Sequence, residues 1–254
     1  MQLENKIRSA LAKKNILLMT HLVLGYPSLA TNREVSRQMV ENGVDLIEMQ
    51  LPFSEPMADG PMIVKANQEA IAKGIRISEC LEFAGEITAA YDIPFLFMTY
   101  YNILYKYGVE QFCERARQLG VTGFIIPDLP PEEGKEYLKL TKDYGIAPVQ
   151  IFAPTSTPER MQEMTKVAGG LIYCVARKGV TGVRTRFSGE ITEYLDRCRR
   201  ATDLPLAVGF GISDKQDVDF LTGKADIAVI GTQTIRIVDE KGPEAVGPFI
   251  AGLR

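Results

Sequence analysis

The chain has 254 residues, with 29 basic and 32 acidic side chains and a formal net charge of −3. This near balance argues against nucleic-acid binding, which usually needs a strongly basic face. One histidine and four cysteines without a C-x-x-C pair support neither a metal site nor a disulfide framework, so we expect buried, reduced thiols.

Residues 1–14 mix charged side chains with Leu3, Ile7 and Leu11, a pattern that indicates an amphipathic helix and not a signal peptide. No apolar run reaches the ~18 residues that a membrane span needs. We therefore expect a soluble, cytoplasmic protein that does not bind membranes.

After this helix, short apolar runs alternate with polar, amphipathic stretches, which is the pattern of a βα repeat. Each run is followed by Pro, Gly or Asp, as expected where a strand gives way to a loop. The expected strands are residues 16–24, 46–49, 95–98, 123–126, 149–152, 171–175, 206–208 and 227–230.

Continuous apolar strands separated by helices indicate a parallel sheet covered on its outer side. Eight of them in about 250 residues favour closure into a TIM barrel. The first βα turn reads Leu24-Gly25-Tyr26-Pro27-Ser28 and lacks G-x-G-x-x-G, so a doubly wound dinucleotide-binding sheet is less well supported. We predict an α/β protein with an eight-stranded parallel (β/α)8 barrel, a single domain over residues 1–254 with an extra N-terminal helix.

Residues 63–91 exceed the minimal repeat and are long enough for two helices, broken near Gly74 and started again at Ser78. We expect both this segment and the N-terminal helix to cover the outside of the barrel.

Two acids lie close together in the sequence on different supports. Glu48 ends an apolar strand, where a desolvated carboxyl group could hold and release a proton, and Asp59 lies in the Pro/Gly-rich loop beyond it. Alternatively, Glu48 could form a salt bridge, and Ser54, Glu55 or Asp59 could cap the following helix. Local chemistry alone leaves the two interpretations equally supported.

Glycines follow the last two expected strands, in Gly209-Phe210-Gly211 and at Gly231 before Thr232. In barrels these loops commonly bind phosphate, because glycine lets backbone N–H groups approach an anion. A helix that starts at Thr232 would add its free N–H groups and its hydroxyl. A single such loop could simply turn the chain, but two after neighbouring strands favour a phosphate site.

Residues 177–186 form a polar, glycine-spaced loop that is long for a βα connection. Such a loop could close over the barrel mouth as a lid, with Thr181 reaching Asp59 or Glu48. Its charges could equally form a solvated surface.

Three motifs in the same order resemble the tryptophan synthase α subunit family. Residues 179–182 resemble its mobile loop and residues 209–213 its phosphate loop. The most specific stretch is Pro52-Phe53-Ser54-Glu55-Pro56-Met57-Ala58-Asp59-Gly60-Pro61.

The resemblance implies a lyase of tryptophan biosynthesis that cleaves indole-3-glycerol phosphate to indole and glyceraldehyde 3-phosphate, with Glu48 and Asp59 as the catalytic acids. It implies no cofactor in this chain and an α2β2 tetramer with a β subunit that carries pyridoxal phosphate. The loop that ends at Asp59 would contact that subunit. The substrate-binding residues are expected to be Tyr173, Thr181, Gly182, Phe210, Gly211, Gly231, Thr232, Met98 and Ile125.

Tyr173 would hydrogen-bond Glu48, although it could equally be a core aromatic residue. Apolar side chains at strand ends, among them Met98, Ile125, Ile151 and Phe210, would line the indole slot.

The sequence departs from the family pattern beside the acids. Gln50 replaces the usual glycine and could narrow the pocket or reorient Glu48, and His21 replaces an aromatic residue. A lone histidine on an apolar strand is more often a core residue, yet this one could titrate near neutrality and touch the ligand. Glu55, Met57 and Thr232 replace Asp, Leu and Ser and preserve the chemistry.

These departures keep an alternative open, a non-catalytic or altered-substrate barrel subunit that binds a phosphosugar. Another phosphosugar isomerase or aldolase would want a lysine at a strand end, and no expected strand here ends in a well-placed one.

Overall fold

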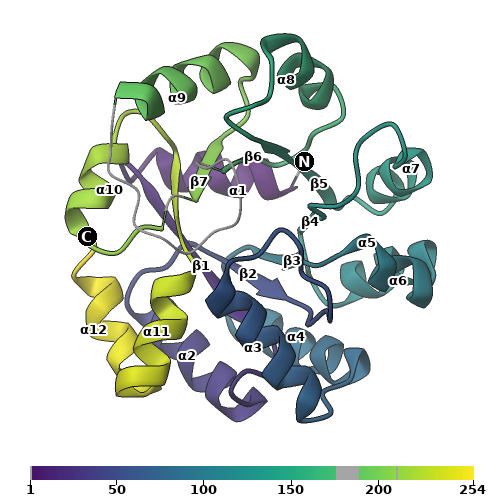
Figure 1. Ribbon diagram of the computed structural model, residues 1–254, viewed down its shortest axis with the longest axis vertical. Helices are drawn as coiled ribbons and strands as arrows, with labels where there is room; N and C mark the ends of the chain where they lie inside the picture. Colours follow the sequence, from purple (N-terminus) through teal and green to yellow (C-terminus); the bar gives the residue numbers. More distant parts are fainter. Residues whose placement is uncertain (1, 176–188, 210) are drawn as a thin grey trace.

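The computed structural model describes residues 2–175, 189–209 and 211–254. Eight parallel strands form a closed barrel in sequence order, with helices around it (Figure 1). The predicted barrel is therefore confirmed, and the expected strand ends agree with the observed ones to within two residues. The strands are β1 (Leu17–Val23), β2 (Leu46–Gln50), β3 (Phe95–Met98), β4 (Gly123–Ile125), β5 (Ala147–Phe152), β6 (Ile172–Val175), β7 (Leu206–Gly209) and β8 (Ile227–Ile230).

Helices fill the connections between the strands. They are α1 (Gln2–Leu11), α2 (Leu29–Glu41), α3 (Pro61–Ala72), α4 (Ile77–Ala90), α5 (Tyr101–Tyr107), α6 (Val109–Gln118), α7 (Lys135–Asp143), α8 (Pro158–Thr165), α9 (Gly189–Ala201), α10 (Lys215–Leu221), α11 (Thr232–Lys241) and α12 (Val246–Ala251), with a short 3-10 turn at Pro243–Ala245. The predicted two helices in residues 63–91 are α3 and α4, which lie outside the barrel and are separated at Gly74, where φ is +81°.

The strands are almost wholly apolar because both of their faces are buried. One set of side chains packs against the surrounding helices, and the other fills the barrel interior. This alternation determines which residues can reach the carboxyl ends of the strands. On β2, Glu48 and Gln50 point to the same side because strand side chains alternate with a period of two.

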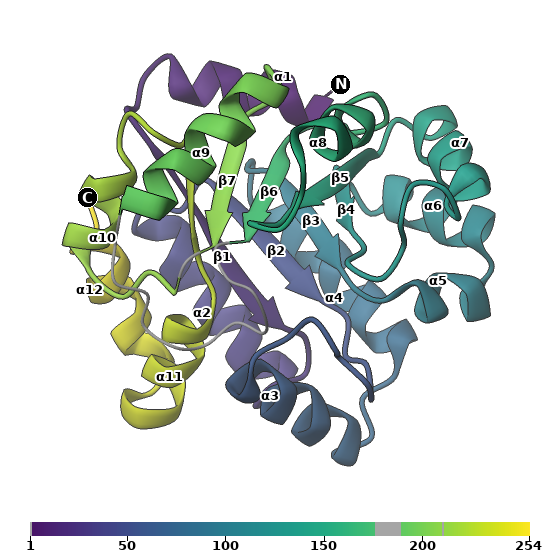
Figure 2. The same cartoon turned by 45° about the horizontal axis from the view of Figure 1, so that its top comes forward.

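The N-terminal helix α1 is present, but the expectation that it covers the outside of the barrel is wrong. It lies across the end at which the strands begin (Figure 2). Leu3 and Ile7 are 0% and 1% exposed and join the interior cluster. Leu3 packs so tightly there that a Cβ added to Gly170 would come within 2.5 Å of it. The helix closes an apolar opening that would otherwise face water.

Asp45, just before β2, ties together three distant parts of the chain. It accepts hydrogen bonds from the Lys14 ammonium at 2.5 Å, from the Leu18 N–H at 2.9 Å and from the Arg254 guanidinium. The carboxylate is buried, with its side chain only 7% exposed, so these contacts compensate its lost hydration.

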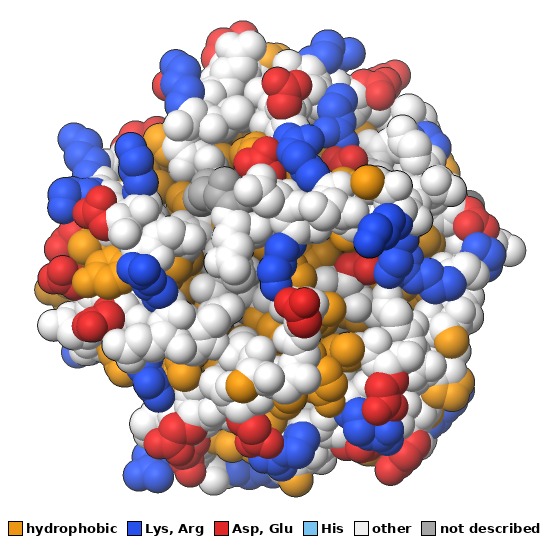
Figure 3. Space-filling view, turned by 180° about the vertical axis from the view of Figure 1, so that it is seen from behind, with side chains coloured by type: hydrophobic (Ala, Val, Ile, Leu, Met, Phe, Trp, Pro, Cys, Tyr) orange, Lys and Arg blue, Asp and Glu red, His pale blue; other side chains and the backbone are white. Residues whose placement is uncertain are grey.

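The cysteines, the surface charges and the helix lengths can be compared with the composition. All four cysteines are buried and free, as predicted. On the face opposite to that of Figure 1, basic and acidic side chains are interspersed rather than gathered by sign (Figure 3). Across residues 2–175, 189–209 and 211–254, no helix has the length and apolar character needed to cross a bilayer.

We expect Asp45→Asn to lower the free energy of unfolding by roughly 2–3 kcal/mol, because two cations lose a buried counter-charge. Denaturant unfolding would measure this loss. Asp92→Asn is the matched control, since Asp92 pairs with Lys6 but its side chain is 96% exposed; it should leave stability nearly unchanged. Equal effects of the two substitutions would refute the role given to Asp45.

Candidate active site

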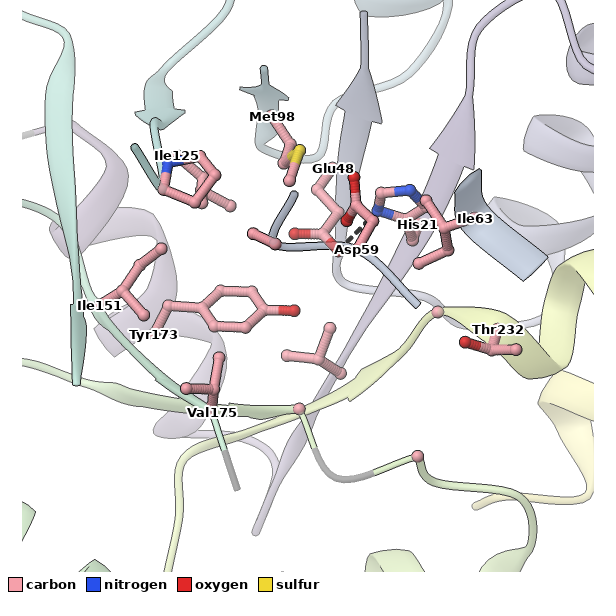
Figure 4. Close-up of a pocket in the computed structure, with 16 residues that line it drawn as sticks. His21, Glu48, Asp59, Ile63, Met98, Ile125, Ile151, Tyr173, Val175 and Thr232 are labelled. Atoms are coloured by element: carbon pink, nitrogen blue, oxygen red, sulfur yellow. Dashed lines mark hydrogen bonds and ion pairs between the residues drawn. The ribbon is translucent and has the colours of Figure 1, made fainter. Parts of the chain in front are cut away.

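A pocket opens at the carboxyl ends of the strands, where a barrel of this kind carries its ligand. Its empty space is about 710 Å³, including the part open to solvent. Most of the wall is apolar, and the few polar groups converge from different strands (Figure 4). The described lining residues are His21, Glu48, Ala58, Asp59, Ile63, Met98, Ile125, Pro127, Ile151, Tyr173, Val175, Gly209, Gly211, Val229, Gly231 and Thr232.

Glu48 is held by the register of neighbouring strands. It lies opposite His21 of β1, and the two side chains meet with 2.8 Å between Glu48 Oε1 and His21 Nδ1. Glu48 is only 3% exposed. Its second oxygen, Oε2, is buried and has no hydrogen-bond partner among the described residues. One carboxylate oxygen is therefore anchored, and the other remains available within the pocket.

Asp59 reaches the pocket from the loop between β2 and α3. Two hydrogen bonds hold this loop in place: the Phe53 N–H donates to Asn67 at 3.0 Å, and the Ala58 N–H donates to the Tyr100 hydroxyl at 3.0 Å. Tyr100 in turn donates to Asp59 Oδ2 at 3.0 Å. The Phe53 ring stacks on Tyr100 with 5.0 Å between ring centroids.

The helix-capping interpretation of Asp59 is wrong. The N-cap of α3 is Gly60, and the Asp59 carboxylate instead accepts hydrogen bonds from Gln50 at 2.7 Å and from Tyr100. Burial raises the pKa of Asp59 above its usual value, although the charge of His21 and these hydrogen bonds act in the opposite direction.

Gln50 and His21, the two departures from the family pattern, connect the acids. His21 Nε2 lies 2.9 Å from Gln50 Oε1, and Gln50 is fully buried. Burial lowers the pKa of His21, but its hydrogen bond to the Glu48 carboxylate and the negative charges of Glu48 and Asp59 outweigh this effect, so the net pKa is raised. Gln50 thus supports Asp59 instead of filling the pocket.

Tyr173 of β6 points its hydroxyl toward the two acids (Figure 4). Burial and the negative charges of Glu48 and Asp59 raise its pKa well above the usual value, so the phenol remains protonated and can donate. A Cβ at position 209 would lie 3.1 Å from this hydroxyl, so Gly209 leaves the room that the tyrosine occupies.

The glycine-rich side of the pocket contains the start of α11. The helix begins at Thr232, as predicted, with Gly231 at its N-cap, and both residues line the pocket together with Gly211. The first N–H groups of a helix lack intrahelical acceptors and carry a positive partial charge. This side of the pocket is therefore suited to an anion.

The structure brings most of the predicted site residues into one pocket, and it adds others. Those brought together are Glu48, Asp59, Tyr173, Met98, Ile125, Gly211, Gly231 and Thr232, together with Ile151. Thr181, Gly182 and Phe210 lie outside the described residues, as does the loop of residues 177–186.

Sequence reasoning missed the role of Tyr100. It also treated His21 and Gln50 as disturbances and not as hydrogen-bond partners of the acids. The period of two on β2, which puts Gln50 on the same side as Glu48, was the available signal. Asp128 accepts the Tyr101 N–H at 2.9 Å and so supports the start of α5.

In the part of the chain that the structure describes, no group of three or more His, Cys, Asp or Glu side chains is arranged to hold a metal ion. The polar groups of the pocket are two carboxylates, an imidazole, a phenol, a threonine hydroxyl and backbone amides, which are suited to proton transfer and to binding an anion.

Comparison with known proteins identifies the family. The family model described as tryptophan synthase alpha chain matches residues 7–247. The tryptophan synthase alpha chain of Desulfotalea psychrophila is 60% identical over 254 residues and covers 100% of both chains. That of Aquifex aeolicus is 35% identical, covering 100% of this chain and 97% of the relative.

Solved structures give the same answer. A structure of Mycobacterium tuberculosis tryptophan synthase superimposes with a TM-score of 0.93 at 28% identity, covering 99% of this chain and 96% of that chain. One of the tryptophan synthase α2β2 complex from Pyrococcus furiosus gives 0.87 at 30% identity, covering 93% and 97%. Because the family model spans most of the sequence and relatives match it over their full length, the chain belongs to the tryptophan synthase alpha chain family.

Proposed function

We propose that this chain cleaves indole-3-glycerol phosphate to indole and glyceraldehyde 3-phosphate, with Glu48 and Asp59 as the catalytic groups. The observation that carries this proposal is the pair of buried carboxylates at one apolar pocket, of which Glu48 keeps an unpartnered oxygen. A retro-aldol reaction on an indole needs one group that transfers protons and one that stabilises charge on the ring nitrogen.

The reaction begins with protonation of indole C3 by Glu48. The ring nitrogen becomes positively charged, and the Asp59 carboxylate accepts its N–H and stabilises that charge. The bond from C3 to the glycerol carbon then breaks, and its electrons restore the aromatic ring. The hydroxyl on that carbon gives its proton to Glu48 as the aldehyde forms, so protons balance over the cycle.

The apolar walls explain the selectivity for indole. Met98, Ile125 and Ile151 line the pocket on the strands between the two acids and Tyr173. The phosphate group of the substrate would bind at Gly211, Gly231 and Thr232, through backbone N–H groups and the Thr232 hydroxyl. Thr181, Gly182 and Phe210 complete the proposed substrate contacts.

The steps above use only side chains and backbone groups of this chain, and we propose that it needs no cofactor of its own. We further propose that it assembles with a pyridoxal phosphate-dependent β subunit in an α2β2 tetramer and works in the cytoplasm. Met57, in the loop that carries Asp59, is 76% exposed and would suit an apolar contact with that subunit.

Glu48→Gln should reduce indole release from indole-3-glycerol phosphate by roughly 10²–10⁴-fold, because the amide cannot transfer the proton. The assay measures indole with and without an added β subunit, and binding of glycerol 3-phosphate should be retained. Glu82→Gln, on the exposed side of α4, is the control and should leave the rate unchanged. A fully active Glu48→Gln variant would refute the assignment.

Asp59→Asn should abolish most activity without lowering stability at pH 7. The raised pKa means that the folded state binds this proton more tightly than the unfolded chain does. Stability therefore falls as pH rises from the unfolded pKa through the raised one, and the ionised group is unfavourable at neutrality. Asparagine removes that cost, so the unfolding midpoint should stay equal or rise. A clear loss of stability at pH 7, like that expected for Asp45→Asn, would contradict this account.

Thr232→Val should raise the KM for indole-3-glycerol phosphate about tenfold, the equivalent of about 1.4 kcal/mol for a lost hydrogen bond to a charged group. The kcat should change little. Thr232→Ser keeps the hydroxyl and is the matched control, so its KM should stay near that of the unaltered protein. Inhibition by glycerol 3-phosphate should weaken in parallel in the valine variant only.

A further inference from the structure

An unbroken chain of buried groups links the two acids. Starting from Glu48, it runs through His21 at 2.8 Å, Gln50 at 2.9 Å, Asp59 at 2.7 Å and Tyr100 at 3.0 Å. It ends at the Ala58 N–H, 3.0 Å from the Tyr100 hydroxyl oxygen. None of the five side chains is more than 7% exposed. We call these five residues the acid bridge.

The direction of each hydrogen bond in the acid bridge can be assigned by starting from the Ala58 N–H group. An N–H group can only donate, so the Tyr100 oxygen accepts from Ala58 and its own hydrogen goes to Asp59. An ionised carboxylate can only accept, so Gln50 presents its NH₂ group to Asp59. The carbonyl oxygen of Gln50, an acceptor only, must then face His21.

This orientation determines the protonation of the imidazole. His21 Nε2 must carry a hydrogen in order to bond to Gln50 Oε1. The other nitrogen, Nδ1, lies against Glu48 Oε1, and that contact is a hydrogen bond only when exactly one proton lies between the two atoms. Either an imidazolium faces an unprotonated Oε1, or a neutral imidazole faces a protonated Oε1.

We propose that His21, oriented by Gln50, shares this single proton with Glu48. His21 is then the positioning residue that supplies Glu48 with a proton in each turnover. The inference rests on the proposed function. With substrate bound, Glu48 carries a second proton on Oε2 while the shared proton stays on His21 Nδ1. As Oε2 gives its proton to indole C3, Oε1 receives the shared proton from His21 Nδ1. When the substrate hydroxyl later returns a proton to Oε2, the one on Oε1 goes back to Nδ1. No proton is taken from solvent.

The electrostatic surroundings favour the protonated imidazole. Glu48 faces it from β2 and Asp59 from the β2–α3 loop, and Tyr173 of β6 points toward both carboxylates. From β8 and α11 the neighbours are the uncharged Val229, Gly231 and Thr232. No lysine or arginine is among the described lining residues. The net pKa of His21 is accordingly raised, despite its burial.

Nuclear magnetic resonance of the ¹⁵N-histidine-labelled protein tests the proposal directly. His21 is the only histidine in the chain, so the signals need no assignment to a residue, and the couplings of each nitrogen to the ring C–H protons distinguish Nδ1 from Nε2. In the absence of substrate, both nitrogens should be protonated at neutral pH. At higher pH only Nδ1 should lose its proton, with a midpoint above 6.5. An Nδ1–H tautomer, or a midpoint at or below 6.5, would overturn the acid bridge.

Glu48→Gln supplies a second test on the same signals. Removing the facing carboxylate should lower the His21 midpoint by about one pH unit or more, since an opposite charge at hydrogen-bond distance stabilises the imidazolium. An unchanged midpoint would show that the two groups do not share a proton. Neither measurement replaces His21, so both remain decisive even if histidine variants fold poorly.

Kinetics then test the link to catalysis. His21→Asn keeps an N–H near the Nδ1 position but cannot titrate, so kcat should fall about tenfold or more while KM changes little. In the unaltered protein kcat should decline as pH rises through the raised pKa, and this decline should vanish in the variant. Thr20→Val, on the same strand with its hydroxyl directed at Met39, is the control and should retain the decline.

The outcomes separate the two proposals. The predicted resonance behaviour without any indole formation would retain the acid bridge and refute the lyase. Indole formation by a protein whose His21 shows the Nδ1–H tautomer would retain the lyase and refute the acid bridge. The same holds if the His21→Asn variant keeps the full rate and the decline of kcat at high pH.

Discussion

Keeping the Asp59 carboxylate charged inside a mostly apolar pocket is the constraint on which the surrounding structure depends. Burial opposes the charge, and the hydrogen bonds from Gln50 and Tyr100 offset only part of that opposition. The loop that carries Asp59 must therefore be held at several points, and it is tied to Tyr100 and to Asn67 of α3. A looser loop would let water reach the carboxylate and weaken its interaction with a positively charged group of a ligand.

The two ends of the barrel differ in how they are closed and in the groups that they hold. At the end where the strands begin, α1 seals the interior with Leu3 and Ile7, and Asp45 joins distant segments through buried contacts. At the other end the pocket opens at the carboxyl ends of the strands. These stabilising contacts thus lie at the end of the barrel opposite to the pocket. They allow the polar groups of the pocket to be held in positions that do not favour folding.

The barrel was predictable from the sequence because its strands are buried on both faces and read as continuous apolar runs. The candidate acids were predictable from their place at a strand end and in the following loop. The position of α1 was not, since an amphipathic pattern shows that one face is buried but not against what. The contact of His21 with Glu48 depends on the register between β1 and β2, which places these two residues opposite each other. The sequence of either strand alone does not determine that register. The role of Tyr100 was similarly not predictable, because its hydrogen-bond partner Asp59 lies 41 residues earlier in the sequence.

The close approach between position 209 and the Tyr173 hydroxyl links two neighbouring strands. Any side chain at position 209 would come too close to the phenol unless the ring shifts. The two positions therefore set the width of the cavity jointly, and neither can be enlarged alone. An enzyme engineered for bulkier indoles would have to shorten residue 173 before, or together with, any change at 209. This order of substitutions restricts the paths along which the specificity of the pocket can diverge.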